Sequence, residues 1–135
     1  MNKTKSFVDS SILLAGWRGV TVLRIKSLTI LSEAQREFVS SPFVRLEVRP
    51  KAIFHKNTDE TAFYDAFFEN VAEWVDDLEK IVGEAENLAE KYGLNGMDAL
   101  RIAAAIIAEA VEFVTAERST SPLSRVKEIK IVSIN

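Results

Sequence analysis

The apolar positions along the chain follow two spacings, one typical of buried strands and one typical of amphipathic helices. Short apolar runs at residues 7–9, 36–40, 112–115 and 128–134 predict strands, and longer segments between them have apolar residues at helical spacing. Strands that alternate with helices predict an α/β domain whose sheet is mainly parallel.

In the first part of the chain, glycines interrupt the helical pattern. We expect a short helix at residues 10–15 and a loop at residues 16–19 that holds Trp17 and Arg18 between two glycines. The apolar spacing at residues 20–31 then predicts a second helix, although β-branched residues are less favourable in a helix.

Capping residues and prolines mark the helices in the middle of the chain. Ser41 and Pro42 form a hydroxyl cap followed by a proline at the first helical position. Pro50 lacks a backbone N–H donor and should kink or split this helix. Asn57 and Glu60 have the spacing of a capping box, which predicts the start of a long amphipathic helix.

The second half of the chain has two further helices. Residues 74–78 either continue the amphipathic helix or form a short strand, which a crossover to the next helix requires. A helix is expected at residues 81–92, with Gly93 just past its end. Residues 98–111 are almost wholly apolar on one face, so we expect this helix to be the most deeply buried.

The totals limit the class of protein. The 135 residues predict a single domain over residues 1–135, and 47% hydrophobic residues can fill a core. The absence of cysteine excludes disulfides and thiolate metal sites. The longest apolar run, residues 102–108, is far shorter than the roughly 20 residues that span a membrane. We therefore predict a soluble, cytoplasmic protein with no membrane partner.

The net charge of −3 argues against a general nucleic-acid coat protein, but the charges are unevenly distributed. Arg45, Arg49 and Lys51 lie in a locally basic segment, whereas residues 59–90 contain eleven acids and only Lys80 as a base. The basic side chains can hold RNA phosphates or the acidic side chains of a protein partner. Pairing with the acidic helix that follows is an equally good interpretation.

Four acids fall where strands end or where flanking helices lie. Asp9 lies at the carboxyl end of the strand at residues 7–9, and Glu117 lies just past the strand at residues 112–115. Asp98 begins the most apolar helix, and Glu47 lies in the helix after the second strand. Neighbouring parallel strands share one carboxyl edge, where ligands bind in open sheets. If these strands are neighbours, the four carboxylates converge. Taken singly, each acid also has an ordinary explanation as a turn residue, an ion-pair partner, a helix N-terminal acid or a solvated side chain.

Four carboxylates in one pocket repel one another, and a divalent cation relieves that repulsion. The chain has no cysteine and a single histidine, His55, which is best interpreted as a surface residue. Oxygen ligands favour Mg²⁺ or Mn²⁺. Such an ion activates a bound water and stabilises an alkoxide leaving group, which implies the hydrolysis of a phosphodiester.

Four segments at residues 7–11, 40–48, 92–100 and 113–117 resemble, in order and spacing, the successive motifs of PIN-domain ribonucleases. The stretch that begins at Gly93-Leu94 and continues through Asp98-Ala99-Leu100 is the most specific part. The resemblance implies a three-layer α/β/α sandwich with about five strands in the order 3-2-1-4-5. It also implies a Mg²⁺- or Mn²⁺-dependent endoribonuclease.

The same resemblance implies roles for individual residues and partners. It implies that Asp9, Glu47 and Asp98 ligate the metal and that Ser10 assists as a hydroxyl. Many members of this size, such as the VapC group, are toxins of toxin–antitoxin pairs. The resemblance therefore also implies an RNA substrate, a homodimer and a small antitoxin that covers the acidic pocket.

The chain departs from the family pattern at two positions. The fourth acid is commonly aspartate, whereas here it is Glu117, whose extra methylene can move the carboxylate away from the metal. A histidine often follows the Asp-Ala-Leu motif, whereas here Arg101 can pair with Asp98 one turn away or meet an RNA phosphate. Thr115 matches the family and should orient a carboxylate or a water.

Arg18 and Arg45, together with Arg101, are candidates for substrate binding, and Trp17 beside Arg18 is suited either to stacking on a base or to packing. Two other functions compete with the toxin. One is a PIN-fold interaction module with weakened catalysis, motivated by Glu117, and the other is an RNA-processing nuclease outside a toxin–antitoxin system. An aspartyl-phosphate phosphatase is disfavoured, because its second aspartate is replaced by Ser11.

Overall fold

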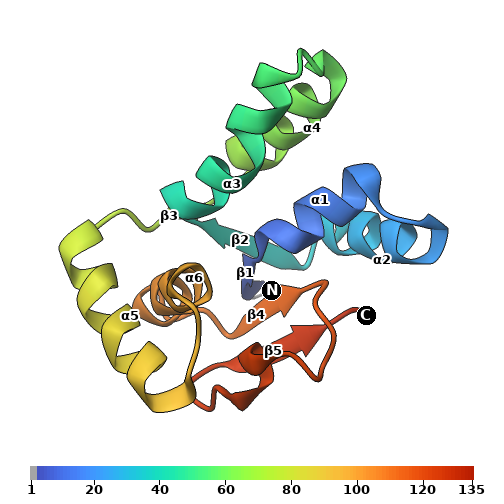
Figure 1. Ribbon diagram of the computed structural model, residues 1–135. Helices are drawn as coiled ribbons and strands as arrows, with labels where there is room; N and C mark the ends of the chain where they lie inside the picture. The colour runs from blue at the N-terminus through green and yellow to red at the C-terminus, as the bar shows by residue number, and fades with distance from the viewer. Residues whose placement is uncertain (1–2) are drawn as a thin grey trace.

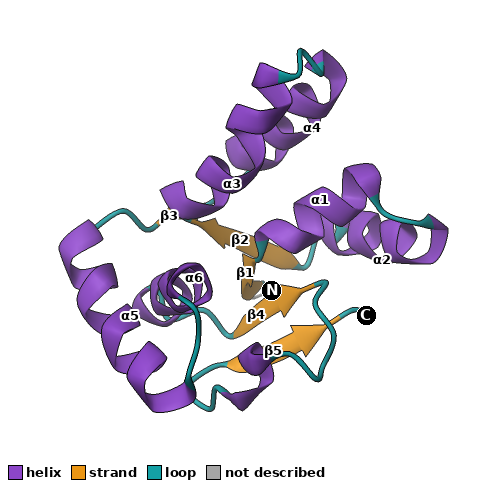
Figure 2. Ribbon diagram, in the orientation of Figure 1, coloured by secondary structure: helices purple, strands orange, loops and turns teal. Residues whose placement is uncertain are grey.

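The computed structural model describes residues 3–135 and contains one five-stranded sheet whose strands are all parallel. The strand order is β3-β2-β1-β4-β5, which confirms the predicted order (Figures 1 and 2). The strands are β1 (Thr4–Val8), β2 (Arg36–Ser40), β3 (Glu73–Trp74), β4 (Glu112–Thr115) and β5 (Lys130–Ser133).

The helices connect successive strands in pairs. The α1–α2 pair and the α5–α6 pair lie on opposite sides of the central strand β1, and the α3–α4 pair projects from the β3 end of the sheet (Figure 1). This arrangement is the expected three-layer sandwich. The helices are α1 (Ser10–Arg18), α2 (Thr21–Ser32), α3 (Pro42–Phe54), α4 (Thr58–Glu69), α5 (Leu78–Tyr92) and α6 (Gly96–Ile107), with a short 3₁₀ turn, η1 (Pro122–Arg125).

The core lies on both faces of β1 and β4, where apolar side chains are fully buried. Phe7 of β1 stacks on Phe113 of β4 with ring centroids 5.5 Å apart. On α6, Ile102 and the alanines at 103–105 have no exposed surface. The small side chains let α6 lie close to the sheet. A strand that is buried on both faces has a near-continuous apolar run in its sequence rather than an alternating one.

The structure differs from the expectations about α1 and removes one of the two alternatives for α3. Residues 16–19 do not form a loop around Trp17 and Arg18, because α1 runs through Gly16 to Arg18. A Cβ at Gly16 would lie 3.1 Å from Cζ of Phe63, so this glycine lets an aromatic ring of α4 approach the helix. Pro50 does not split α3, which continues to Phe54. Pro50 faces solvent, where water can satisfy the carbonyl that lacks a helical partner.

Element boundaries in the second half differ from the expected ones. The short strand is β3 at Glu73–Trp74, so α5 already begins at Leu78 rather than at residue 81. The apolar helix α6 begins at Gly96 and ends at Ile107, before the expected end at residue 111. Asn57 precedes α4, but its side chain donates a hydrogen bond to Glu60 Oε1 instead of capping a backbone N–H.

The register of the strands aligns their carboxyl ends. Phe7 pairs with Val39 on β2, and Val8 pairs with Val114 on β4. The residue that follows β1 therefore lies between the ends of β2 and β4. Within residues 3–135, no helix combines the length and the apolarity that crossing a membrane would require. Met1 and Asn2 lie outside the described residues.

Candidate active site

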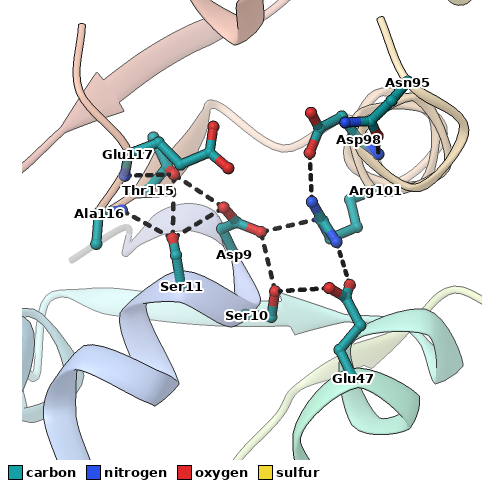
Figure 3. Close-up of polar contacts among 10 residues, drawn as sticks. All are labelled: Asp9, Ser10, Ser11, Glu47, Asn95, Asp98, Arg101, Thr115, Ala116 and Glu117. Carbon is teal, nitrogen blue, oxygen red and sulfur yellow. Dashed lines mark hydrogen bonds and ion pairs between the residues drawn. The ribbon is translucent and has the colours of Figure 1, made fainter. Parts of the chain in front are cut away.

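Asp9 lies directly after the central strand, at the point where the chain turns into α1. Its backbone N–H donates a hydrogen bond to the Val114 carbonyl at 2.9 Å, which extends the pairing of β1 with β4 by one residue. Asp9 occupies the position before the first helical residue, yet its side chain caps no backbone N–H of α1. The carboxylate is 1% exposed and points away from the helix, toward neighbouring side chains (Figure 3).

Two hydroxyls hold one oxygen of Asp9. Oδ2 accepts hydrogen bonds from Ser11 Oγ at 2.9 Å and from Thr115 Oγ1 at 2.8 Å, and the two hydroxyls lie 3.1 Å apart. The backbone N–H of Ala116 donates to Ser11 Oγ, and that of Glu117 donates to Thr115 Oγ1. The end of β4 thereby positions both hydroxyls, and the hydroxyls position the carboxylate (Figure 3).

Asp98 is placed by the start of α6. The side chain of Asn95 accepts a hydrogen bond from the Asp98 backbone N–H at 2.9 Å, so Asn95 is the cap and Asp98 lies in the first turn. The Asp98 side chain is buried, and a carboxylate in the first turn is favoured by the helix dipole. Asp98 therefore faces the sheet edge from the opposite side to α1.

Arg101 joins three of the four predicted acids. Its Nη2 pairs with Asp98 Oδ1, its Nη1 pairs with Glu47 Oε1, and its Nε lies 2.9 Å from Asp9 Oδ1 (Figure 3). The Nε–H is not aimed at the Asp9 oxygen, so this contact is an ion pair rather than a hydrogen bond. Arg101 is only 5% exposed. Burial lowers the pKa of Arg101, but attraction to the three carboxylates outweighs burial and raises it.

Ser10 links Asp9 to Glu47 on the far side of the site. Its Oγ lies 3.4 Å from Asp9 Oδ1 and 3.3 Å from Glu47 Oε2, and it has a single proton to donate. Glu47 is half-buried on α3. Together, Ser10 and Arg101 contact both oxygens of Glu47 and hold its carboxylate near Asp9.

Glu117 stands apart from this network. It lies two residues beyond β4, is half-buried, and points toward the space beside Asp9 and Asp98 (Figure 3). Burial and then repulsion from Asp98 and Asp9 raise the pKa of its carboxyl. Glu117 therefore lies close enough to Asp98 and Asp9 to be repelled by their charges. Among the described residues, the ion pairs of Arg101 do not include Glu117.

The donor set suits a hard divalent cation in its chemistry. All four acids offer oxygen, and three already surround one positive group, the Arg101 guanidinium. Across residues 3–135, however, no three acidic or histidine side chains stand close enough to hold an ion directly. In the described arrangement, Asp9, Glu47, Asp98 and Glu117 therefore match a divalent cation in donor chemistry but not in spacing.

The structure does not bring every candidate to this cluster. Arg18 donates to Glu60 from Nε at 2.9 Å and from Nη2 at 3.1 Å, which joins α1 to α4. The guanidinium of Arg45 lies over the Trp74 ring at 5.1 Å. The sequence also left Ser11 without a role, although its place two residues after Asp9, in the first turn of α1, was the available signal.

Comparisons with known proteins point to one family. A model of the PIN domain matches residues 6–128. Among curated proteins, no sequence matches the chain significantly.

Solved structures share the fold at low sequence identity. The chain is 17% identical to one in the crystal structure of VapBC2 from Rickettsia felis bound to a DNA fragment from their promoter, with a TM-score of 0.73 over 98% of this chain and 100% of that chain. It is also 17% identical to a chain of a toxin–antitoxin complex from Klebsiella pneumoniae, with a TM-score of 0.74 over 95% of this chain and 96% of that chain. The identity to a chain of the crystal structure of FitAcB from Neisseria gonorrhoeae is 12%, with a TM-score of 0.64 over 95% of this chain and 96% of that chain. At these identities the structures demonstrate a common fold.

Proposed function

The chain belongs to the PIN domain family, and we propose that it is a Mg²⁺- or Mn²⁺-dependent endoribonuclease. The observation that carries this proposal is the meeting of acids from separate elements around one positive group at the carboxyl edge of the sheet. Members of the family are generally nucleases. The match to residues 6–128 also supports the proposal that residues 1–135 act as one domain.

The proposed ligands are Asp9, Glu47, Asp98 and, from the other side, Glu117. When bound, the ion would supply an activated water and neutralise the charge that develops on the leaving oxygen. Ser11 and Thr115 fix the Asp9 carboxylate by hydrogen bonds to Oδ2, so its other oxygen keeps a defined direction. In the metal-free protein, burial and repulsion from Asp98 and Asp9 raise the pKa of the Glu117 carboxyl, which supports its place beside the other proposed ligands.

We further propose that the protein is the toxin of a type II toxin–antitoxin pair that acts on RNA as a homodimer. Two of the similar structures are described as a toxin–antitoxin complex and as VapBC2. A small antitoxin is the proposed protein partner. Localisation in the cytoplasm remains a prediction.

A second candidate function is a PIN-fold interaction module with weakened catalysis. The observation that favours it is Arg101, which already pairs with three of the four acids. In that case the acids serve folding rather than metal binding. An RNA-processing nuclease outside a toxin–antitoxin system would use the same catalytic site as the leading proposal. It would differ from the proposed toxin only in having no antitoxin partner.

RNA cleavage assays test the leading proposal. The native protein is expected to cleave RNA with Mg²⁺ or Mn²⁺ and to lose activity with EDTA. Asp98→Asn should reduce the rate by about a hundredfold or more, because a metal ion contributes several kcal/mol to such a transition state. Asp77→Asn is the matched control, since Asp77 also lies at a helix start, where it caps the Lys80 N–H of α5. Equal rates for the native protein and Asp98→Asn would contradict the proposal.

A further inference from the structure

Arg101 places a positive group among three of the four acids of the cluster. Its three nitrogens face one oxygen each of Asp9, Glu47 and Asp98, and 5% of its surface is exposed. A guanidinium keeps its charge at any physiological pH. The metal-free cluster is therefore already partly neutralised from within the chain.

Most carboxylate oxygens of Asp9, Glu47 and Asp98 already contact Arg101 or a hydroxyl, so few are free to bind a metal ion. Asp9 uses Oδ1 toward Arg101 and Oδ2 toward two hydroxyls, and Glu47 uses Oε1 toward Arg101 and Oε2 toward Ser10. Among the described residues, no hydrogen bond reaches Oδ2 of Asp98. An ion that approaches the cluster must compete with the guanidinium for the same oxygens.

We propose that Arg101 is a built-in counter-ion of the metal site, which holds Asp9, Glu47 and Asp98 together in the metal-free protein and competes with the divalent ion for them. This inference rests on the proposed function, since it concerns the affinity of that site for its metal. It makes Arg101 a positioning residue whose charge sets the metal concentration at which the site fills.

Two opposite effects follow from one substitution. Loss of the positive charge at residue 101 removes the competitor, so a divalent ion should bind more tightly. The same loss leaves three carboxylates facing one another without a cation, so the metal-free protein should unfold at a lower temperature. Because the ion binds the folded form, it should then restore more stability to the variant than it adds to the native protein. A purely structural arginine would produce only the loss of stability.

Calorimetric titration with Mn²⁺ tests the first effect. Arg101→Gln is expected to bind Mn²⁺ about tenfold or more tightly than the native protein, because two like charges in a poorly solvated site repel strongly. Arg101→Lys keeps the charge, so its affinity should stay closer to the native value. Arg36→Gln is the matched control, since Arg36 pairs with the buried Glu112 at the opposite, amino end of the strands, and its affinity should be unchanged.

Thermal unfolding with EDTA and with Mn²⁺ tests the second effect. The midpoint of Arg101→Gln should lie below that of the native protein in EDTA and should rise further on addition of Mn²⁺. If Arg101→Gln does not fold without metal, the double variant Glu47→Gln/Arg101→Gln removes one acid together with the arginine. That double variant should bind Mn²⁺ more tightly than Glu47→Gln alone.

The outcomes separate this inference from the function on which it rests. Equal Mn²⁺ affinity of the native protein and Arg101→Gln, with weaker binding by Asp98→Asn, would overturn the role of Arg101 and leave the metal site intact. A failure of every variant and of the native protein to bind Mn²⁺ would overturn both proposals. Tighter binding by Arg101→Gln and unchanged binding by Arg36→Gln would support both.

Discussion

The Nε of Arg101 lies 2.9 Å from Oδ1 of Asp9, so the second turn of α6 contacts the residue that follows the central strand. Arg101 belongs to α6, and Asp9 precedes α1, which lies on the other side of β1 (Figure 1). The ion pair therefore connects the two outer layers across the carboxyl edge of the sheet. The shape of the site depends on how closely α6 packs.

Ser11→Ala should weaken the site without removing a ligand. The substitution deletes the hydroxyl that donates to Asp9 Oδ2 and accepts from the Ala116 N–H. Because residues that orient a metal ligand typically contribute about 10–100-fold to affinity or activity, RNA cleavage and Mn²⁺ affinity should fall by about that factor.

Ser32→Ala serves as the control for this change. The exposed Ser32 hydroxyl donates only to the Leu28 carbonyl within α2, and Ser32 precedes the amino end of β2, whereas the acids lie at the carboxyl edge of the sheet. Cleavage by this variant should equal that of the native protein. If Ser11→Ala and Ser32→Ala behave alike, Ser11 has no positioning role.

Glu60→Gln should destabilise the protein at neutral pH and much less in acid. Glu60 is 2% exposed, and although burial raises its pKa, hydrogen bonds from Arg18 and Tyr64 outweigh burial and lower it. A lowered pKa means that folding favours the ionised carboxylate. Its contribution is therefore present above the ordinary glutamate pKa of about 4.3 and is lost as the pH falls toward the lowered value.

Denaturant unfolding measures this effect. At pH 7 the free energy of unfolding should drop by about 1–3 kcal/mol, the usual size for a hydrogen bond to a charged group. The difference between Glu60→Gln and the native protein should shrink below the ordinary glutamate pKa. Glu69→Gln, at an exposed position on the same helix, should change little at any pH. A difference that persists unchanged in acid would argue against ionisation as its cause.

Gly83 inside α5 and Gly93 just past its end should respond to substitution by alanine in opposite directions. Gly83 lies inside the helix, and a Cβ there meets nothing within 4 Å, so Gly83→Ala should stabilise the protein by about 0.5–1 kcal/mol. Gly93 ends the helix with φ of 68°, so Gly93→Ala should destabilise it by about 1–2 kcal/mol. Chemical denaturation of both variants checks the signs, and a shift of both in the same direction would contradict this account.

The strand pattern and the rule that ligands gather at the carboxyl edge were enough to place Asp9 correctly after β1. The apolar pattern after Asp98 likewise predicted that Asp98 lies at the start of a helix, and it lies in the first turn of α6. Both positions depend on short segments of sequence, for which the spacing of apolar residues is a good predictor. The strand order came from the family resemblance and is confirmed by the structure.

Features that depend on tertiary contacts were missed. The interval of one helical turn predicted that Arg101 can pair with Asp98, but the additional contacts with Asp9 and Glu47 follow only from the packing of α6 beside α3. Gly16 was interpreted as a loop residue because its packing partner, Phe63, lies on a different helix. The sequence likewise did not reveal that Arg18, a candidate for substrate binding, pairs with Glu60 of α4.

The residues of the acid cluster are widely separated along the chain, and this separation has a consequence during synthesis. Thr115 and Asp9 are 106 residues apart, and Arg101 and Glu47 are 54 apart. A ribosome makes the amino-terminal part first, and β1 cannot pair with β4 before residues 112–115 have emerged. The acid cluster therefore cannot form until translation is nearly complete, so any activity that depends on it begins only after almost the whole chain has been made.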